Sequence, residues 1–304
     1  MNAVFKPTVS DGAIECIIPT TESQREVWLG ATLSTEASMA YNESVLLRLR
    51  GALDEEALAR AMDRLLERHQ ALRATISPDG TCMLVSHPGE NVLTRQDLSG
   101  LEPEARAQAL RSAHGQAVCT PFSLEHGPLF RAVLYRLGNA EHELVMSAHH
   151  VVCDGWSWGV ITEQLGHLYA EQSGTGLKLK AAPLFSDFAA EEAAAAAHPD
   201  MQAHVDYWLG RFPGSTQPVL DLPLDRPRPA ARTFNSRRTE RLLDKRLVGT
   251  LRVTSTKAGA SLFTGLLSGF VATLHRLTGQ EDIVVGVPAS GQLAHDVPDW
   301  SAIA

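Results

Sequence analysis

The chain has 304 residues, of which 27 are Lys or Arg and 35 are Asp or Glu, so its formal net charge is −8 at pH 7. An acidic chain offers no broad basic surface for a phosphate backbone, so we do not expect nucleic acid as a partner. A hydrophobic fraction of 44% and a charged fraction of 20% are typical of one large or two ordinary globular domains. No stretch predicts a signal peptide or a membrane span. The four cysteines form no CxxC pair, so we expect reduced thiols, a cytoplasmic location and no zinc cage.

In the first half of the chain, apolar periodicity predicts an α/β sandwich. Apolar residues that alternate with polar ones predict strands, and apolar residues repeated every three or four positions predict helices. Asp54 is the expected N-cap of the first helix, and Pro78-Asp79-Gly80 the expected hairpin turn. In chain order, the prediction is a strand at 43–51, a helix at 53–73, a hairpin at 74–86, a helix at 103–118, paired strands at 128–137 and 142–149, and a helix at 156–172.

The second half is predicted to begin with a polar linker at 172–183. After it we expect an Ala-rich helix at 191–212, an extended connector at 222–232, a buried helix at 261–279 closed by Gly279, and an apolar strand with a turn at 281–292. We therefore predict a lead-in at 1–20, a first lobe at 21–175 and a second lobe at 176–304.

Two adjacent histidines, His149 and His150, end the last predicted strand of the first lobe. A single histidine there most often completes a hydrogen bond, but neighbours on a strand point to opposite faces, so one ring should enter the core and the other a cleft. A metal site needs three or more converging ligands, and we expect none here. Acid–base work or hydrogen bonding to a reacting group remains.

The residues after the histidines turn the chain into a helix. Asp154 before Gly155 is either an ordinary N-cap or part of a site in which the helix N-terminus stabilises a developing oxyanion. Cys153 is expected to be a buried, inert thiol.

Residues 149–155, HHVVCDG, resemble the HHxxxDG motif of the condensation domains of nonribosomal peptide synthetases. Further stretches resemble other motifs of that family in the family's order, so the resemblance runs from about residue 20 to 299. These are TESQREVWL at 21–29 (with Ser23 where Ala is usual), RHQALRATI at 68–76, PFSLEHGPLFR at 121–131, FSDF at 185–188 and LPLDRPRP at 222–229. GVPASGQ at 286–292 is similar to the form found in mixed polyketide–peptide lines.

This resemblance implies two chloramphenicol-acetyltransferase-like lobes in a V-shaped pseudo-dimer. It implies amide formation between a donor acyl or peptidyl thioester and an acceptor aminoacyl thioester. The donor and acceptor carrier proteins would bring both on phosphopantetheine arms, beside neighbouring synthetase or polyketide synthase modules, with no cofactor bound by the domain itself.

By the same resemblance, His150 is the active-site histidine, either as general base or as the group that positions the amine. Gly155 would leave room for the pantetheine and offer its N–H. His149 and Asp154 would support the site, with Asp154 paired to Arg73 or Arg131.

Three alternatives stay open beside this hypothesis. The spacing of His149 and Asp154 also resembles glycerolipid acyltransferases, which usually bring membrane segments or a basic surface. A carrier-independent acyltransferase of the same superfamily would share the motif. The third is a non-catalytic remnant, which either binds carrier proteins or is inert. A heterocyclisation domain is excluded, because it has aspartates in place of the histidines.

The end of the chain departs from the family pattern. The family continues past residue 304, so the second lobe is expected to be incomplete, and such a chain is expected to associate and to lack activity by itself. Residues 299–304 are hypothesised to be an off-frame tail, because typical codons for the family's Leu-Val-Gly-His-Cys, read one nucleotide out of frame, encode Trp-Ser-Ala-Ile-Ala.

Overall fold

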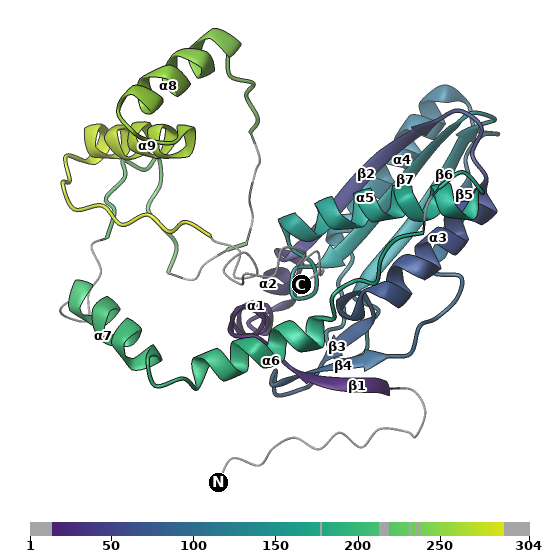
Figure 1. Cartoon of the computed structure of the whole chain (residues 1–304). Helices are drawn as coiled ribbons and strands as arrows, with labels where there is room; N and C mark the ends of the chain where they lie inside the picture. The colour runs from purple at the N-terminus through teal and green to yellow at the C-terminus, as the bar shows by residue number, and fades with distance from the viewer. Residues whose placement is uncertain are drawn as a thin grey trace. The chain divides into compact units, whose positions relative to one another are not determined.

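The computed structural model describes residues 14–176, 178–212, 219–230, 233–234, 236 and 239–288. Contacts between Cα atoms divide these residues into two compact units, 14–198 and 199–288. Figure 1 shows the strands and helices α1 to α6 in the first unit, and helices α7 to α9 in the second.

The first unit contains two β-sheets. A three-stranded sheet has the order β1-β4-β3, and a four-stranded sheet the order β2-β7-β6-β5. The pair β5–β6 is parallel, and the other pairs are antiparallel. The strands are β1 (Ile14–Pro19), β2 (Asn42–Arg50), β3 (Ala74–Ile76), β4 (Cys82–Ser86), β5 (Leu93–Asp97), β6 (Phe130–Gly138) and β7 (Glu141–His149).

Helices cover both faces of the four-stranded sheet. The main core gathers Leu134, Leu144 and Met146 from the sheet with apolar residues of α3 and α5, and a smaller cluster joins Tyr135 and Val145 to α4. Because side chains alternate along a strand, β7 is buried on both faces. The helices of this unit are α1 (Glu22–Ala31), α2 (Thr35–Met39), α3 (Glu55–Arg68), the 3₁₀ helix η1 (Gln70–Arg73), α4 (Pro103–Cys119), α5 (Gly155–Gln172) and α6 (Phe185–Ala196).

The alternation predicted for the first half is confirmed. Asp54 caps α3, since its carboxylate accepts the backbone N–H of Ala57 at 2.9 Å. The predicted hairpin is β3–β4, and Gly80 in its turn has a φ of +71°. A Cβ atom at Gly80 would lie 2.4 Å from the Trp28 ring, so both the conformation and the close approach require glycine. The sequence reading missed β1, α1, α2 and β5.

The second unit consists of helices α7 (Met201–Arg211), α8 (Lys245–Lys257) and α9 (Leu262–Thr278). The single Ala-rich helix predicted at 191–212 is wrong, because α6 ends at Ala196 and α7 begins at Met201. Pro199 lies in the break, and a proline cannot continue a helix that precedes it.

Helix α9 ends as predicted at Gly279, whose φ of +70° is the left-handed conformation of a helix C-cap. The predicted burial of this helix is wrong, since Leu274 is its one buried residue. The predicted strand at 281–292 is also wrong over 281–288, where the chain has no regular structure, and its remainder lies outside the described residues. A strand needs a hydrogen-bonded neighbour, and no strand is described between residues 199 and 288 to supply one.

Helix α6 packs on the first unit, against β1 and η1. The lobe boundary at 175/176 stays a prediction, as does the tail at 299–304, which lies outside the described residues.

In the described part of the chain no single helix is long and apolar enough to cross a membrane. Helices α8 and α9 pass that test only as a pair, which is bent by 103°.

Candidate active site

The two histidines lie where β7 leaves the four-stranded sheet. His149 is the last residue of β7 and pairs with Asn42 of β2, and the next four residues form the turn that leads to Asp154. The backbone N–H of His150 donates to the carbonyl of Tyr41 at 2.8 Å, so β2 also fixes the first residue of the turn. The position of both rings therefore follows from the pairing of β2 with β7.

The ring of His149 points into the core. It is fully buried; its Nδ1 accepts the backbone N–H of Val151 at 3.2 Å, and its Nε2 lies 3.5 Å from the hydroxyl of Ser38. Burial lowers the pKa of His149 to about 4, with a further lowering by the neighbouring His150 ring and a partial increase from a hydrogen bond with the backbone of Ser38. The ring is therefore neutral at physiological pH, and because Nδ1 accepts, its hydrogen is on Nε2.

His150 points the other way, and its side chain keeps 34% of its exposure. Its Nδ1 lies 3.0 Å from the carbonyl oxygen of Cys153. Since a carbonyl can only accept, this contact assigns the hydrogen of the neutral ring to Nδ1 and leaves the lone pair of Nε2 available. The prediction that one ring is buried and the other is not is confirmed, because His149 is fully buried and the His150 side chain is one-third exposed.

Cys153 is fully buried, as expected. Burial raises the pKa of its thiol, with smaller increases from Glu43 and Asp154 and a partial lowering by a hydrogen bond with Ser157. A thiol in this environment stays protonated and is a poor nucleophile.

Asp154 is the N-cap of α5. Its Oδ1 accepts the backbone N–H of Ser157 at 2.7 Å and the Ser157 hydroxyl at 2.6 Å, while that hydroxyl lies 3.2 Å from the backbone N–H of Asp154. This is a capping box, which satisfies helix N–H groups that have no intrahelical partner.

The predicted pairing of Asp154 with an arginine is wrong. Arg73 forms an ion pair with Glu15 at 2.6 Å and donates to backbone carbonyls beside it. Arg131 donates to the carbonyl of Pro121 at 2.8 Å. Neither arginine lies within ion-pair distance of Asp154. Arg73 is bound by Glu15 and Arg131 by backbone carbonyls, while the Asp154 carboxylate accepts the backbone N–H of Ser157 at the start of α5.

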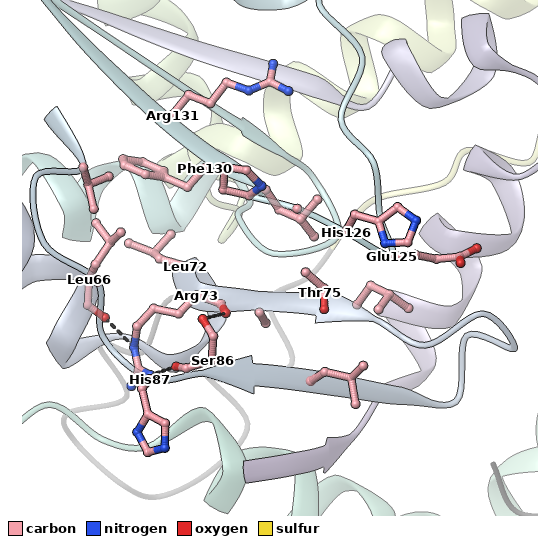
Figure 2. A pocket seen from close by; sticks show the side chains of 18 of the residues that line it. Leu66, Leu72, Arg73, Thr75, Ser86, His87, Glu125, His126, Phe130 and Arg131 are labelled. Atoms are coloured by element: carbon pink, nitrogen blue, oxygen red, sulfur yellow. Dashed lines mark hydrogen bonds between the residues drawn. The ribbon is translucent and has the colours of Figure 1, made fainter. Parts of the chain in front are cut away.

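Both arginines line a cavity of about 1180 Å³ instead. Figure 2 shows Arg73 beside Leu66, Ser86 and His87, and Arg131 beside Phe130 on β6. Neither His149 nor His150 belongs to the lining of this cavity. The two arginines predicted to support the site are therefore not brought together with the histidines.

Gly155 is the first residue of α5 and is exposed. A Cβ atom built on Gly155 would meet no other atom within 4 Å, so the protein leaves space at this helix N-terminus. A helix N-terminus carries unsatisfied N–H groups and a partial positive charge, which favour an oxygen that gains negative charge.

The sequence reading missed Glu43 of β2. Its Oε1 lies 3.4 Å from Nδ1 of His150, and its Oε2 accepts the indole N–H of Trp158 at 2.8 Å. The sequence predicted the strands at 43–51 and 142–149 but not that they pair, so no local pattern placed Glu43 beside His150.

It also missed Gln24, whose side-chain amide donates to the carbonyl of Val151 at 2.9 Å and so holds the turn after His150 from α1. In the part of the chain that the structure describes, no three His, Cys, Asp or Glu side chains converge as metal ligands would.

Comparison with known proteins places this arrangement in a family. The model of the condensation domain matches residues 14–301. Chondramide synthase cmdD of Chondromyces crocatus is 34% identical over 273 residues, which are 88% of this chain and 7% of that protein. Phosphinothricin tripeptide synthetase PhsC of Streptomyces viridochromogenes is 32% identical over 291 residues, which are 93% of this chain and 26% of that protein. The chain thus spans a small part of these synthetases.

Solved structures agree with this. The first condensation domain of the calcium-dependent antibiotic synthetase, in complex with a substrate analogue, is 25% identical with a TM-score of 0.70, over 95% of this chain and 67% of that one. The X-domain from teicoplanin biosynthesis is 25% identical with a TM-score of 0.76, over 99% and 64%. The α/β fold of this chain is the chloramphenicol-acetyltransferase-like fold of those domains, and the chain belongs to the condensation-domain family of nonribosomal peptide synthetases.

Proposed function

We propose that this chain forms an amide bond between a donor acyl or peptidyl thioester and the amine of an acceptor aminoacyl thioester, with His150 at the reacting centre. The observation that carries the proposal is the orientation of His150. Its Nδ1 is occupied by the Cys153 carbonyl, and its Nε2 is left available on a ring that is one-third exposed.

The reaction is an aminolysis. The amine nitrogen attacks the thioester carbonyl, the C–N bond forms, the C–S bond breaks, the nitrogen loses a proton and the leaving thiolate gains one. Nε2 of His150 can take the proton, or hold the amine in line for attack. Neither a metal nor a covalent enzyme intermediate is needed, because holding the two reactants together supplies much of the rate.

The proposed partners are a donor and an acceptor carrier protein with their phosphopantetheine arms, together with neighbouring modules. The space at Gly155 suits the approach of such an arm to the N-terminus of α5. His149 and Asp154 support the site through the core and the helix cap, and Arg73 and Arg131 contribute to the fold of the same unit.

The test is amide formation with loaded donor and acceptor carrier proteins, measured by mass spectrometry. His150→Ala is expected to lower the rate by about 10²-fold or more without loss of stability, and His167→Ala, exposed on α5, is the matched control. An unchanged rate in His150→Ala would remove His150 from the mechanism. Product from free thioesters without carriers would favour the carrier-independent acyltransferase, and carrier binding without product the non-catalytic alternative.

A further inference from the structure

The carboxylate of Glu43 lies beside Nδ1 of the His150 ring. Its Oε1 is 3.4 Å from Nδ1 of His150, and the Cys153 carbonyl is 3.0 Å from the same nitrogen. Nδ1–H therefore bonds to the Cys153 carbonyl, and the Glu43 carboxylate lies beside it at ion-pair distance. The hydrogen bond fixes the ring, and the nearby negative charge favours the tautomer with the hydrogen on Nδ1.

Glu43 is itself held in place. Its Oε2 accepts the indole N–H of Trp158 at 2.8 Å, and Trp158 is 8% exposed in the core of the first unit. The carboxylate thus bridges α5 to the turn that carries His150, with one oxygen for each. No Lys or Arg of the described residues forms an ion pair with Glu43, so its charge is not neutralised by another cation.

The other groups near His150 do not compensate for this charge. His149 is buried and neutral, and Tyr41 stacks on the His150 ring with centroids 6.5 Å apart. The Cys153 thiol is protonated, and the Asp154 carboxylate is bound by Ser157. Glu43 is therefore the acidic group in direct contact with the ring.

We propose that Glu43 is a positioning residue of the reaction. It orients His150 through Nδ1 and stabilises the imidazolium that forms when Nε2 takes up the proton of the amine. The inference rests on the proposed function, and it adds to it a carboxylate–histidine pair in which the base is oriented by a third group. The physical basis is the attraction between a carboxylate and an imidazolium in contact, which a neutral side chain of the same shape cannot supply.

The test separates charge from shape. Glu43→Gln keeps the size of the side chain but removes the charge and one acceptor. With histidine labelled by ¹⁵N in the full chain, and with His150 assigned by its loss in His150→Gln, the ring nitrogens report both the tautomer and the pH at which the ring gains its second proton. In Glu43→Gln we expect a smaller fraction of the Nδ1–H tautomer and a pH profile moved to lower pH by about half a unit. We expect kcat for amide formation to fall about tenfold with little change in KM.

Glu55→Gln is the matched control. Glu55 lies 3.2 Å from the buried His142, so this variant removes another histidine–carboxylate contact of the same sheet. It should alter the His142 signals and leave the His150 signals and the rate unchanged. Trp158→Phe, which frees the carboxylate without removing its charge, should change the tautomer in the same direction as Glu43→Gln.

Two results would overturn the proposal. One is a His150 profile that is the same in Glu43→Gln as in the wild type. The other is a changed profile with an unchanged kcat. The ring signals are read without turnover, so a wild-type chain that makes no amide would count against the proposed function, while the spectra would still decide the role of Glu43.

Discussion

The side-chain oxygen of Gln70 accepts the backbone N–H of Ser186 at 3.0 Å, across 116 positions of the sequence. Gln70 belongs to RHQALRATI and Ser186 to FSDF, so two of the stretches that resemble motifs of the family meet in one hydrogen bond. The contact joins α6 to η1 within the first unit, beside the buried rings of Phe185 and Phe188.

Gln70→Ala should therefore loosen α6. Removing the acceptor leaves a helix N–H without its partner in a part-buried position, which costs about 1–3 kcal/mol of unfolding free energy. Chemical denaturation measures this loss, and limited proteolysis should cut faster between residues 173 and 198. Gln96→Ala, on the exposed side of β5, is the control and should change stability by less than about 0.5 kcal/mol. Equal stability of the two variants would contradict the role given to Gln70.

Asp154→Ala removes a helix cap and not an ion pair, so the expected loss of unfolding free energy is about 1–2 kcal/mol. Asp154→Ser should recover most of it. Asp54→Ala, which removes the cap of α3, should cost a similar amount without affecting amide formation. In a double-mutant cycle, Asp154→Ala and Arg73→Ala should be additive within about 0.5 kcal/mol. A larger coupling energy would indicate that Asp154 and Arg73 interact, contrary to the structure.

Two buried histidines make stability depend on pH. Burial lowers the pKa of His69 to about 4, partly opposed by its hydrogen bond to Gln164, and the pKa of His149 is lowered to the same value. Both rings are neutral when folded and gain protons on unfolding below the ordinary value of 6.5. Their contribution is therefore fully present above pH 6.5 and is lost as pH falls toward 4, at up to about 3 kcal/mol for each ring.

Urea denaturation at several pH values checks this dependence. His69→Gln should reduce the loss of unfolding free energy between pH 6.5 and pH 4, whereas His167→Gln, at an exposed position, should not. The same slope in His69→Gln and wild type would show that His69 takes up its proton at the same pH in the folded and the unfolded protein.

Gly155→Ala tests whether the open space at the start of α5 is used by a substrate. The added methyl group meets no protein atom, so stability should stay the same or rise by up to about 1 kcal/mol. The rate of amide formation should fall on the order of tenfold to a hundredfold, because the methyl group would displace the arm. Gly159→Ala, also in open space on α5, is the control and should keep the wild-type rate. Full activity in Gly155→Ala would show that the substrate does not use the open space at the N-terminus of α5.

The sequence predicted those parts of the fold whose pattern is local. Strand β7 and helix α5 follow from periodicity, and Asp54 and Gly279 from the chemistry of helix ends. Strand β1 was missed because its six residues, IECIIP, show no sustained alternation, since Cys16, Ile17 and Ile18 follow one another as apolar residues.

The site divides in the same way. Two adjacent histidines on a strand predicted one buried and one presented ring, because that follows from the geometry of a single strand. Glu43 and Gln24 were not predicted, because their contacts depend on the register of β2 and on the docking of α1, which no local pattern specifies. The pairing of Asp154 with an arginine was carried over from the family resemblance, whereas the carboxylate is half-buried and bound by its own helix.

The ladder between β2 and β7 has a consequence for how the site is made. It pairs Asn42 with His149 at the end next to the site, and Arg50 with Glu141 at the other end. The paired residues are therefore about 100 positions apart in the sequence. Contacts between such distant residues form late, because the loop between them must close before the contacts stabilise it. During synthesis, Tyr41 and Glu43 leave the ribosome long before His150, so their contacts with His150 can form only after it has been synthesised. We therefore expect the ring to be oriented only after β2 and β7 have paired, so that a mispaired β2 would yield a chain with the right helices and an unoriented histidine.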